Sequence, residues 1–477
     1  MTTRLPGDVR RILAAQALRA FAYGFGAVLL GVTLRQRGYS AVLAGVVLTA
    51  VVAGTVVASL LLARYADRAG RRRCYVIMYL LLAVVGVVFA ASAPLWVLLT
   101  ASLTGALSTE VVESGPFTSL EQPMLATGLD RGRQVAGFGV YNAVATAAGS
   151  VGALAAGLPG LARHWWTSPP ADDRYFLVFV PVALAGALVA ARLSPAVEAP
   201  PAPPAAMPRR RPVDRSRPVV YRLCALFAVD SLGGGFVIQA FVAYWFSARF
   251  GAPIGVIGTV FFASGLLQAL SFLVAVRLGE RFGLLRTMVF THLPSNLLLM
   301  AVAFAPGFGW AAGLWLARVS LSQMDVPARQ AYVMALVDPG EQTGAAAYTN
   351  TARYLTRPLG PVLAGASQSL ALGLPFLLAG IIKSGYDLAL WRWFRHVPVP
   401  GEPGPGPTLV PPAPIPRRAH DRLPARRRGT SRDPGPLPGL DQRGPCHPRS
   451  PRHPRRARPR ALRRRGRDRG PDDLAQP

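Results

Sequence analysis

Ionisable side chains interrupt several long apolar stretches of this sequence, and they are its strongest candidates for chemistry. Arg19 lies about 7 residues into the first stretch, which is roughly 10 Å along a helix. Asp230 occupies the matching place in the seventh stretch. Charge is costly at membrane depth, so such residues are expected to bind a partner, a proton or a substrate. We predict an Arg19–Asp230 ion pair or a proton-binding site at Asp230, and a purely structural pair is the alternative.

Two further apolar stretches, the fourth and the tenth, carry charges of opposite sign: Glu110, Glu113 and Glu121 in one, and Arg318, Asp325 and Arg329 in the other. At the offset of an internal repeat, Glu110 matches Arg318 and Glu121 matches Arg329, which suits ion pairs that form and break. For the deeper residues of this set, Glu113 among them, we expect a functional role. The residues nearer the helix ends, such as Glu121 and Asp325, are equally well explained as solvated caps.

The eleventh stretch places two arginines on one helix face. Asn350, Arg353 and Arg357 are spaced i, i+3, i+7. Two arginines on one face favour an anionic substrate or a carboxylate partner, and snorkelling to the membrane interface is the alternative. Gln239 in the seventh stretch is a further candidate for lining the same pathway.

Helices that cross a membrane must position these groups. The chain has 477 residues, 51% of them hydrophobic, and its charges cluster between the apolar stretches. A bilayer is spanned by about 20 mostly apolar residues. We therefore predict an all-α membrane protein with twelve transmembrane helices, at 12–34, 41–63, 75–92, 95–120, 135–158, 174–193, 219–246, 253–276, 286–305, 309–332, 344–369 and 372–393.

Arginine-rich segments alternate with arginine-poor ones, which sets the predicted orientation. All but one of the 52 basic residues are arginines, and Lys383 is the exception. The segment 64–73 is among the most basic and is expected on the cytoplasmic side. An even number of spans then places both termini in the cytoplasm, and we expect a multi-pass protein of the plasma membrane.

Two stretches rich in Pro and Arg divide the chain. Residues 194–218 are a predicted cytoplasmic linker between six-helix bundles at 1–193 and 219–396. Residues 397–477 have few large apolar side chains and are expected to form a disordered cytoplasmic tail. Its basic segment 454–470 would suit nucleic acid or anionic lipid. A plain extension, or translation in a non-native frame, is the preferred explanation, so no nucleic-acid partner is expected.

The two bundles are related by an internal duplication. Three pairs of segments align at nearly one offset: 22–25 with 233–236, 66–73 with 279–286, and 129–144 with 337–352. Repeats of this kind place a substrate site near the midplane, between the halves.

The loop after the second predicted helix carries an ordered motif, with Asp67, Arg68, Gly70 and Arg71 in the order Asp-Arg-x-Gly-Arg. A degenerate copy stands in the second half: Glu280, Arg281 and Gly283. Gly70 allows a tight turn, and Asp67 is placed to cap the next helix or to pair with an arginine. A plain arginine anchor in anionic headgroups is the alternative.

With this loop the chain resembles the major facilitator superfamily over roughly residues 10–395. The family's hallmark reads Gly-x-x-x-Asp-Arg-x-Gly-Arg-Arg or similar, and Ala63 replaces its first glycine here. The resemblance implies a two-half transporter whose loop latches the halves in one state of the cycle. Drug exporters of the family tend to carry an Arg motif in the fourth helix and a Gly-Pro motif in the fifth. Both are absent here, which weakens a drug-efflux assignment.

We accordingly expect a secondary active transporter of a small organic solute, working by alternating access with proton coupling and, preferably, efflux by proton antiport. Uptake of an anion and a non-transporting receptor or scaffold are the alternatives. Motifs for nucleotide hydrolysis and a nucleophile elbow are missing, which argues against a pump or an enzyme. The histidines are isolated, so no metal site or cofactor is expected, and His292 is interpreted as a packing residue, with a proton relay as the alternative. The expected partners are the substrate, protons and the lipid bilayer, and the expected functional unit is a monomer.

Overall fold

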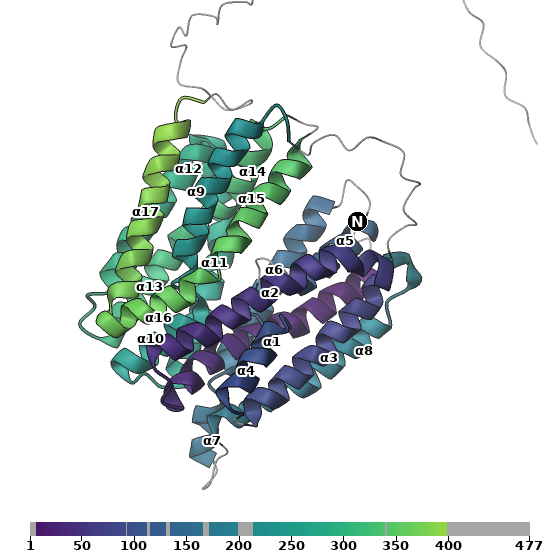
Figure 1. Ribbon diagram of the computed structural model, residues 1–477, viewed down its shortest axis with the longest axis vertical. Helices are drawn as coiled ribbons and strands as arrows, with labels where there is room; N and C mark the ends of the chain where they lie inside the picture. The colour runs from purple at the N-terminus through teal and green to yellow at the C-terminus, as the bar shows by residue number, and fades with distance from the viewer. Residues whose placement is uncertain are drawn as a thin grey trace, which may run out of the picture. The chain divides into compact units, whose positions relative to one another are not determined.

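The computed structural model describes residues 6–91, 93–111, 115–129, 134–165, 171–198, 213–338 and 341–397 (Figure 1). Over these ranges the regular structure is helical. The predicted tail beyond Val397 and the linker residues 199–212 lie outside the described residues, as does Glu113. We refer to residues 6–198 as the first half and to residues 213–397 as the second half. The predicted domain limits themselves stay a prediction.

The first half contains, in chain order, the following helices: α1 (Gly7–Gln36), α2 (Ala41–Ala69), α3 (Arg71–Ala90), α4 (Leu95–Leu103), α5 (Pro116–Thr127), α6 (Gln134–Ala155), α7 (Leu158–Trp165), η2 (Asp172–Val178), α8 (Phe179–Ala191) and η3 (Pro195–Val197). The second half contains α9 (Arg217–Gly235), α10 (Gln239–Phe250), α11 (Ile254–Phe282), α12 (Leu284–Val302), α13 (Phe308–Ser322), α14 (Asp325–Leu336), α15 (Gln342–Thr356), α16 (Leu359–Leu370) and α17 (Leu374–Phe394).

Within the described ranges, eight helices or helix pairs are long and apolar enough to cross a membrane. The four other predicted spans fall on α12 and on the broken pairs α4/α5, α13/α14 and α15/α16. The all-α membrane fold is thus confirmed, while the count of twelve spans stays a prediction.

Four predicted spans are interrupted near their middle. The breaks contain Glu110, Val237, Gln323 and Arg357, and all four residues line one cavity. Pro358 contributes to the last break, because proline lacks an N–H and crowds the preceding turn. Irregular backbone at membrane depth is tolerated where it lines a cavity, since water or a solute can satisfy its polar groups.

Equivalent glycines of the two halves make equivalent contacts. A Cβ atom on Gly24 would lie 1.9 Å from the carbonyl oxygen of Gly149, and one on Gly235 would lie 2.9 Å from the Cα of Gly360. Both pairs are related by the offset that aligns segment 22–25 with 233–236. Small residues allow α1 to pack closely on α6, and α9 on α16, within each half. The structure therefore repeats the contacts that the duplicated sequence predicts.

The halves meet through α1 with α10, α2 with α16, and α6 with α11 (Figure 1). The Thr49 hydroxyl donates a hydrogen bond to the Pro358 carbonyl at 2.9 Å, and the Tyr244 hydroxyl donates one to the Tyr39 carbonyl, also at 2.9 Å. Gly258 packs against the backbone of Ala153. These contacts lie toward the end of the helices at which α2 and α11 begin.

Candidate functional site

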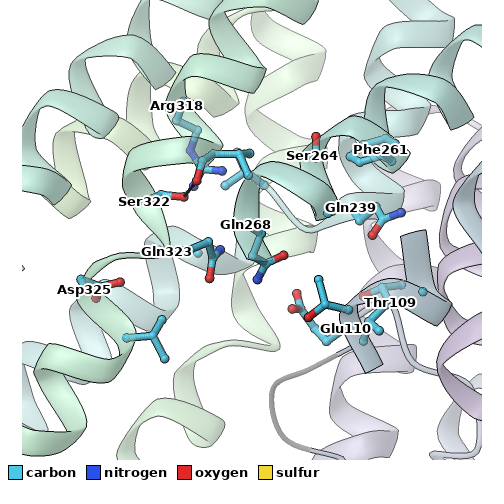
Figure 2. Close-up of a pocket in the computed structure, with 18 of the residues that line it drawn as sticks. Thr109, Glu110, Gln239, Phe261, Ser264, Gln268, Arg318, Ser322, Gln323 and Asp325 are labelled. Carbon is cyan, nitrogen blue, oxygen red and sulfur yellow. Dashed lines mark hydrogen bonds between the residues drawn. The ribbon is translucent and has the colours of Figure 1, made fainter. Parts of the chain in front are cut away.

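A cavity of about 200 Å³ lies between the two halves. Its walls come from α6, from α9 to α15 and from α17, together with the segment that links α4 to α5. In Figure 2, Arg318, Ser322 and Gln323 approach it from one side, and Thr109 and Glu110 from the opposite side. Five basic side chains and three carboxylates line it: Arg318, Arg329, Arg353, Arg357 and Lys383, and Glu110, Asp230 and Asp325.

Most of the pathway residues predicted from the sequence line this cavity: Glu110, Asp230, Gln239, Arg318, Arg353 and Arg357. Asp325 and Arg329, predicted as charge pairs at the inner end, line it too. Their side chains are buried, so the solvated-cap interpretation is wrong for them. Asn350 is exposed on α15, and Arg19 is buried inside the first half.

Arg19 forms a closed ion pair with Glu121, so the predicted Arg19–Asp230 pair is wrong for this structure. Its Nε and Nη2 atoms donate to the two carboxylate oxygens at 3.0 and 2.8 Å. The hydroxyls of Tyr75 and Tyr141 donate to the same carboxylate at 2.8 and 2.6 Å. Arg19 is 2% exposed and Glu121 is 0% exposed. A buried pair is tolerated when its remaining hydrogen-bonding capacity is satisfied, as it is here.

The solvated-cap interpretation of Glu121 is therefore also wrong. The chain breaks after α4 and starts a new helix at Pro116, which carries Glu121 into the first half rather than to a helix end. Its neighbours are the Arg19 side chain of α1 and Tyr75 of α3.

Asp230 of α9 lies at the centre of a charge cluster in the second half. Lys383 of α17 donates to it at 2.5 Å, and Arg329 of α14 donates at 3.4 Å. Arg329 also donates to Asp325 at 3.1 Å. His292 of α12 brings its Nε2 atom to within 4.0 Å of Asp230. One carboxylate thus faces three basic groups on three different helices.

His292 joins this cluster to a second buried carboxylate, so its interpretation as a packing residue is incomplete. Its Nδ1 atom lies 2.9 Å from the nearer oxygen of Asp387. Asn296 donates to Asp387 at 2.8 Å, and Asp387 is 0% exposed. Sequence reasoning missed Lys383 and Asp387 as site residues. The single lysine of the chain, in an apolar stretch with an aspartate four residues later, was the available signal.

One ion pair within the cavity joins the halves. Arg357, in the break between α15 and α16, donates to Glu110 at 2.6 Å. Glu110 is therefore paired with Arg357 and not with Arg318, its partner in the repeat. Arg318 lies with its guanidinium carbon 4.9 Å from the centre of the Trp315 ring, and its Nε has no hydrogen-bond partner among the described residues.

The loop motif forms the tight turn predicted from Gly70, whose φ of 95° lies in the left-handed region. Gly283 repeats it with a φ of 88°. Asp67 pairs with Arg71 at 2.7 Å, while Arg68, Glu280 and Arg281 are exposed. Glu198 caps the following helix by accepting the backbone N–H groups of residues 71 and 72 at 2.6 and 3.3 Å. The latch function of this loop stays a prediction.

The helical fold, its internal repeat and a charged cavity between the halves define a membrane transporter. The family model described as Major Facilitator Superfamily matches residues 12–248. The chain belongs to this superfamily.

The uncharacterized membrane protein YJR124C of Saccharomyces cerevisiae is 25% identical over 426 residues, which cover 82% of this chain and 94% of that protein. Among solved structures, the inward-open xylose transporter XylE from E. coli aligns with a TM-score of 0.62 and 14% identity, covering 83% of this chain and 98% of its own. The nucleoside transporter NupG aligns with a TM-score of 0.61 and 15% identity, covering 80% and 97%. These likenesses confirm the transporter fold.

Proposed function

We propose that this protein is a secondary transporter that moves a small organic solute by alternating access. The observation that carries the proposal is the cavity between the halves, which both halves line with ionisable groups. Its volume of about 200 Å³ is below the roughly 300–1,000 Å³ of pockets for drug-sized ligands, so the cargo is small. The similar solved structures include a xylose transporter and a nucleoside transporter, which supports an organic solute.

Proton coupling is the second part of the proposal, and it rests on Asp230. This carboxylate lines the cavity, binds Lys383, and lies 4.0 Å from His292, which in turn contacts Asp387. Protonation of Asp230 removes the counter-ion of Lys383 and weakens the tie between α9 and α17. A proton taken from the cavity thereby changes the contacts of helices that must move.

The conformation fits an inward-open state. The contacts between the halves lie toward the end at which α2 begins, and the arginine distribution assigns that end to the outer face. In this orientation both termini lie in the cytoplasm, and the protein resides in the plasma membrane. Efflux by proton antiport is the direction we propose first.

Anion uptake with protons is the second candidate, and the cavity charge favours it. Five basic side chains face three carboxylates there, so an anionic solute would balance the site. A receptor or scaffold without transport would gain nothing from the Asp230 cluster, because buried charges lower stability unless they are fully compensated.

The test is a resistance and uptake screen in a transporter-deficient host, followed by proteoliposomes loaded with a pH-sensitive dye. The solute found should move protons across the membrane, with antiport and symport distinguished by reversing the imposed pH gradient. Asp230→Asn should reduce solute-coupled proton movement at least tenfold. The control, Asp214→Asn, makes the same chemical change at an exposed position near the start of α9. Equal coupling in both variants would rule out Asp230 as the proton site.

A further inference from the structure

Arg318 differs from the basic residues of the cavity that form ion pairs. Its side chain on α13 is 9% exposed, and among the described residues no carboxylate lies within ion-pair distance of it. The three carboxylates of the cavity wall are engaged elsewhere: Glu110 with Arg357, Asp230 with Lys383 and Arg329, and Asp325 with Arg329. A guanidinium that is buried without a counter-ion costs free energy that a bound anion would recover.

The surroundings of Arg318 combine an aromatic wall with polar groups. Its guanidinium lies 4.9 Å from the centre of the Trp315 ring, and Trp315 packs edge-on against Phe261 at 6.1 Å. Ser264 and Gln268, one turn apart on α11, line the same cavity (Figure 2). The Trp315 ring gives the guanidinium a cation–π contact, and the Nε–H group of Arg318 has no hydrogen-bond partner among the described residues.

We propose that Arg318 is the anchor for the carboxylate of a small organic monoanion, with the apolar part of that solute against Trp315 and Phe261. The inference deepens the proposed transport function and rests on it. The guanidinium fork matches the two oxygens of a carboxylate, which a neutral amide of the same shape lacks. The neighbouring cations Arg329, Arg357 and Lys383 already have carboxylate partners, so they do not require a second charge on the solute. The amide of Gln268 supplies a further donor at the cavity wall.

The test uses acids paired with amides of nearly the same shape: acetate with acetamide, butyrate with butyramide, benzoate with benzamide and phenylacetate with phenylacetamide. The readout is the unfolding temperature of the purified full-length protein in detergent, measured over a range of concentrations. At least one acid, most strongly an aromatic one, should raise the unfolding temperature, and its amide should not. The proposal is overturned if no acid does so, or if acid and amide act equally.

Substitutions locate the effect. Arg318→Gln should weaken binding of the acid at least tenfold, Arg318→Lys should weaken it less, and the control Arg286→Gln, at an exposed position, should leave it unchanged. Arg318→Met should also raise the unfolding temperature of the ligand-free protein, because it removes a buried charge that no ion pair compensates directly. If the role of Arg318 were merely structural, Arg318→Met would lower the unfolding temperature. Acid binding that survives Arg318→Gln contradicts the proposal even if Arg318→Met behaves as expected.

Failure of the subsite and failure of transport are distinguishable. If no acid binds and Arg318→Lys does not change solute-driven proton movement, the carboxylate subsite is rejected and the transport function is retained. Acid binding that depends on Arg318, without movement of any solute in proteoliposomes, would keep the subsite and reject transport.

Discussion

The two halves use equivalent positions in opposite ways. Arg19 and Glu121 of the first half correspond in the repeat to Asp230 and Arg329 of the second, so the same ion pair occurs with its polarity reversed. In the first half the pair is bidentate and capped by two tyrosine hydroxyls. In the second half Arg329 is 3.4 Å from Asp230, which binds Lys383 more closely.

We call the Arg19–Glu121 pair, which is enclosed within one half, the fixed joint, and the Asp230–Arg329 pair, which faces the cavity, the adjustable joint. The first-half pair lies outside the cavity wall with its hydrogen bonds satisfied, so it has no reason to open during transport. The second-half pair lines the cavity and shares its carboxylate with Lys383 and His292. In the transport mechanism that we propose, the inverted charges let one copy of the duplicated contact hold helices together and the other respond to protons or solute.

The largest expected effect tests the fixed joint. Glu121→Gln leaves Arg19 buried without a counter-ion and should lower the free energy of unfolding by about 3–5 kcal/mol. Chemical denaturation in mixed micelles measures this. The double variant Arg19→Met/Glu121→Met should recover most of the loss, because it removes both charges together. If Glu121→Gln cost less than the equivalent change Asp230→Asn, the comparison of the halves would be reversed.

An intermediate effect tests the adjustable joint. Asp230→Asn should abolish coupling but reduce stability less than Glu121→Gln, because the cavity lets water reach Lys383. The double variant Asp230→Asn/Lys383→Gln should be more stable than the sum of the two single changes predicts, by about 1–3 kcal/mol. Additive single effects would show that the two groups do not interact in the native protein.

The smallest effect tests a charge outside the membrane-spanning segments. Glu341 accepts the backbone N–H groups of residues 214, 215 and 216 at 2.8–2.9 Å, and these bonds lower its pKa from 4.5 to about 2. Because the pKa is lower in the folded state, the stabilisation is present above pH 4.5 and is lost as the pH falls toward 2. Glu341→Gln should therefore lower the unfolding temperature slightly at pH 7, and the difference from the native protein should shrink on acidification. A difference that stays constant with pH would contradict this role.

The sequence predicted the helices and the repeat because apolar length and self-similarity are local properties of the chain. It also singled out Asp230, Arg318 and Arg357, which line the cavity, since charge in an apolar stretch is visible without a structure. It failed on the partner of Arg19. Equivalent residues of a two-fold repeat touch each other only when both lie near the symmetry axis. The alignment of Arg19 with Asp230 does not give the distance of either residue from that axis.

Two other errors have a similar physical origin. Glu121 looked like a helix cap because the break between α4 and α5 cannot be read from an apolar stretch. Lys383 and Asp387 were not predicted as site residues, because their spacing of four residues does not show which helix each side chain contacts. Lys383 contacts α9 through Asp230, and Asp387 contacts α12 through His292. Only tertiary packing decides between these arrangements.

The four helix breaks along the cavity have a consequence for genetics. Where a helix stops, its last carbonyl groups lack the usual partner within the helix. Some are taken up by the next turn, as the Gly233 carbonyl is by the Phe236 N–H, and any others that face the cavity can accept a hydrogen bond from its occupant. Side-chain substitutions at Gln323 or Val237 leave those backbone acceptors in place. An alanine scan of this transporter would therefore under-report its recognition surface, and insertions or deletions that shift a break by one residue would reveal the remainder.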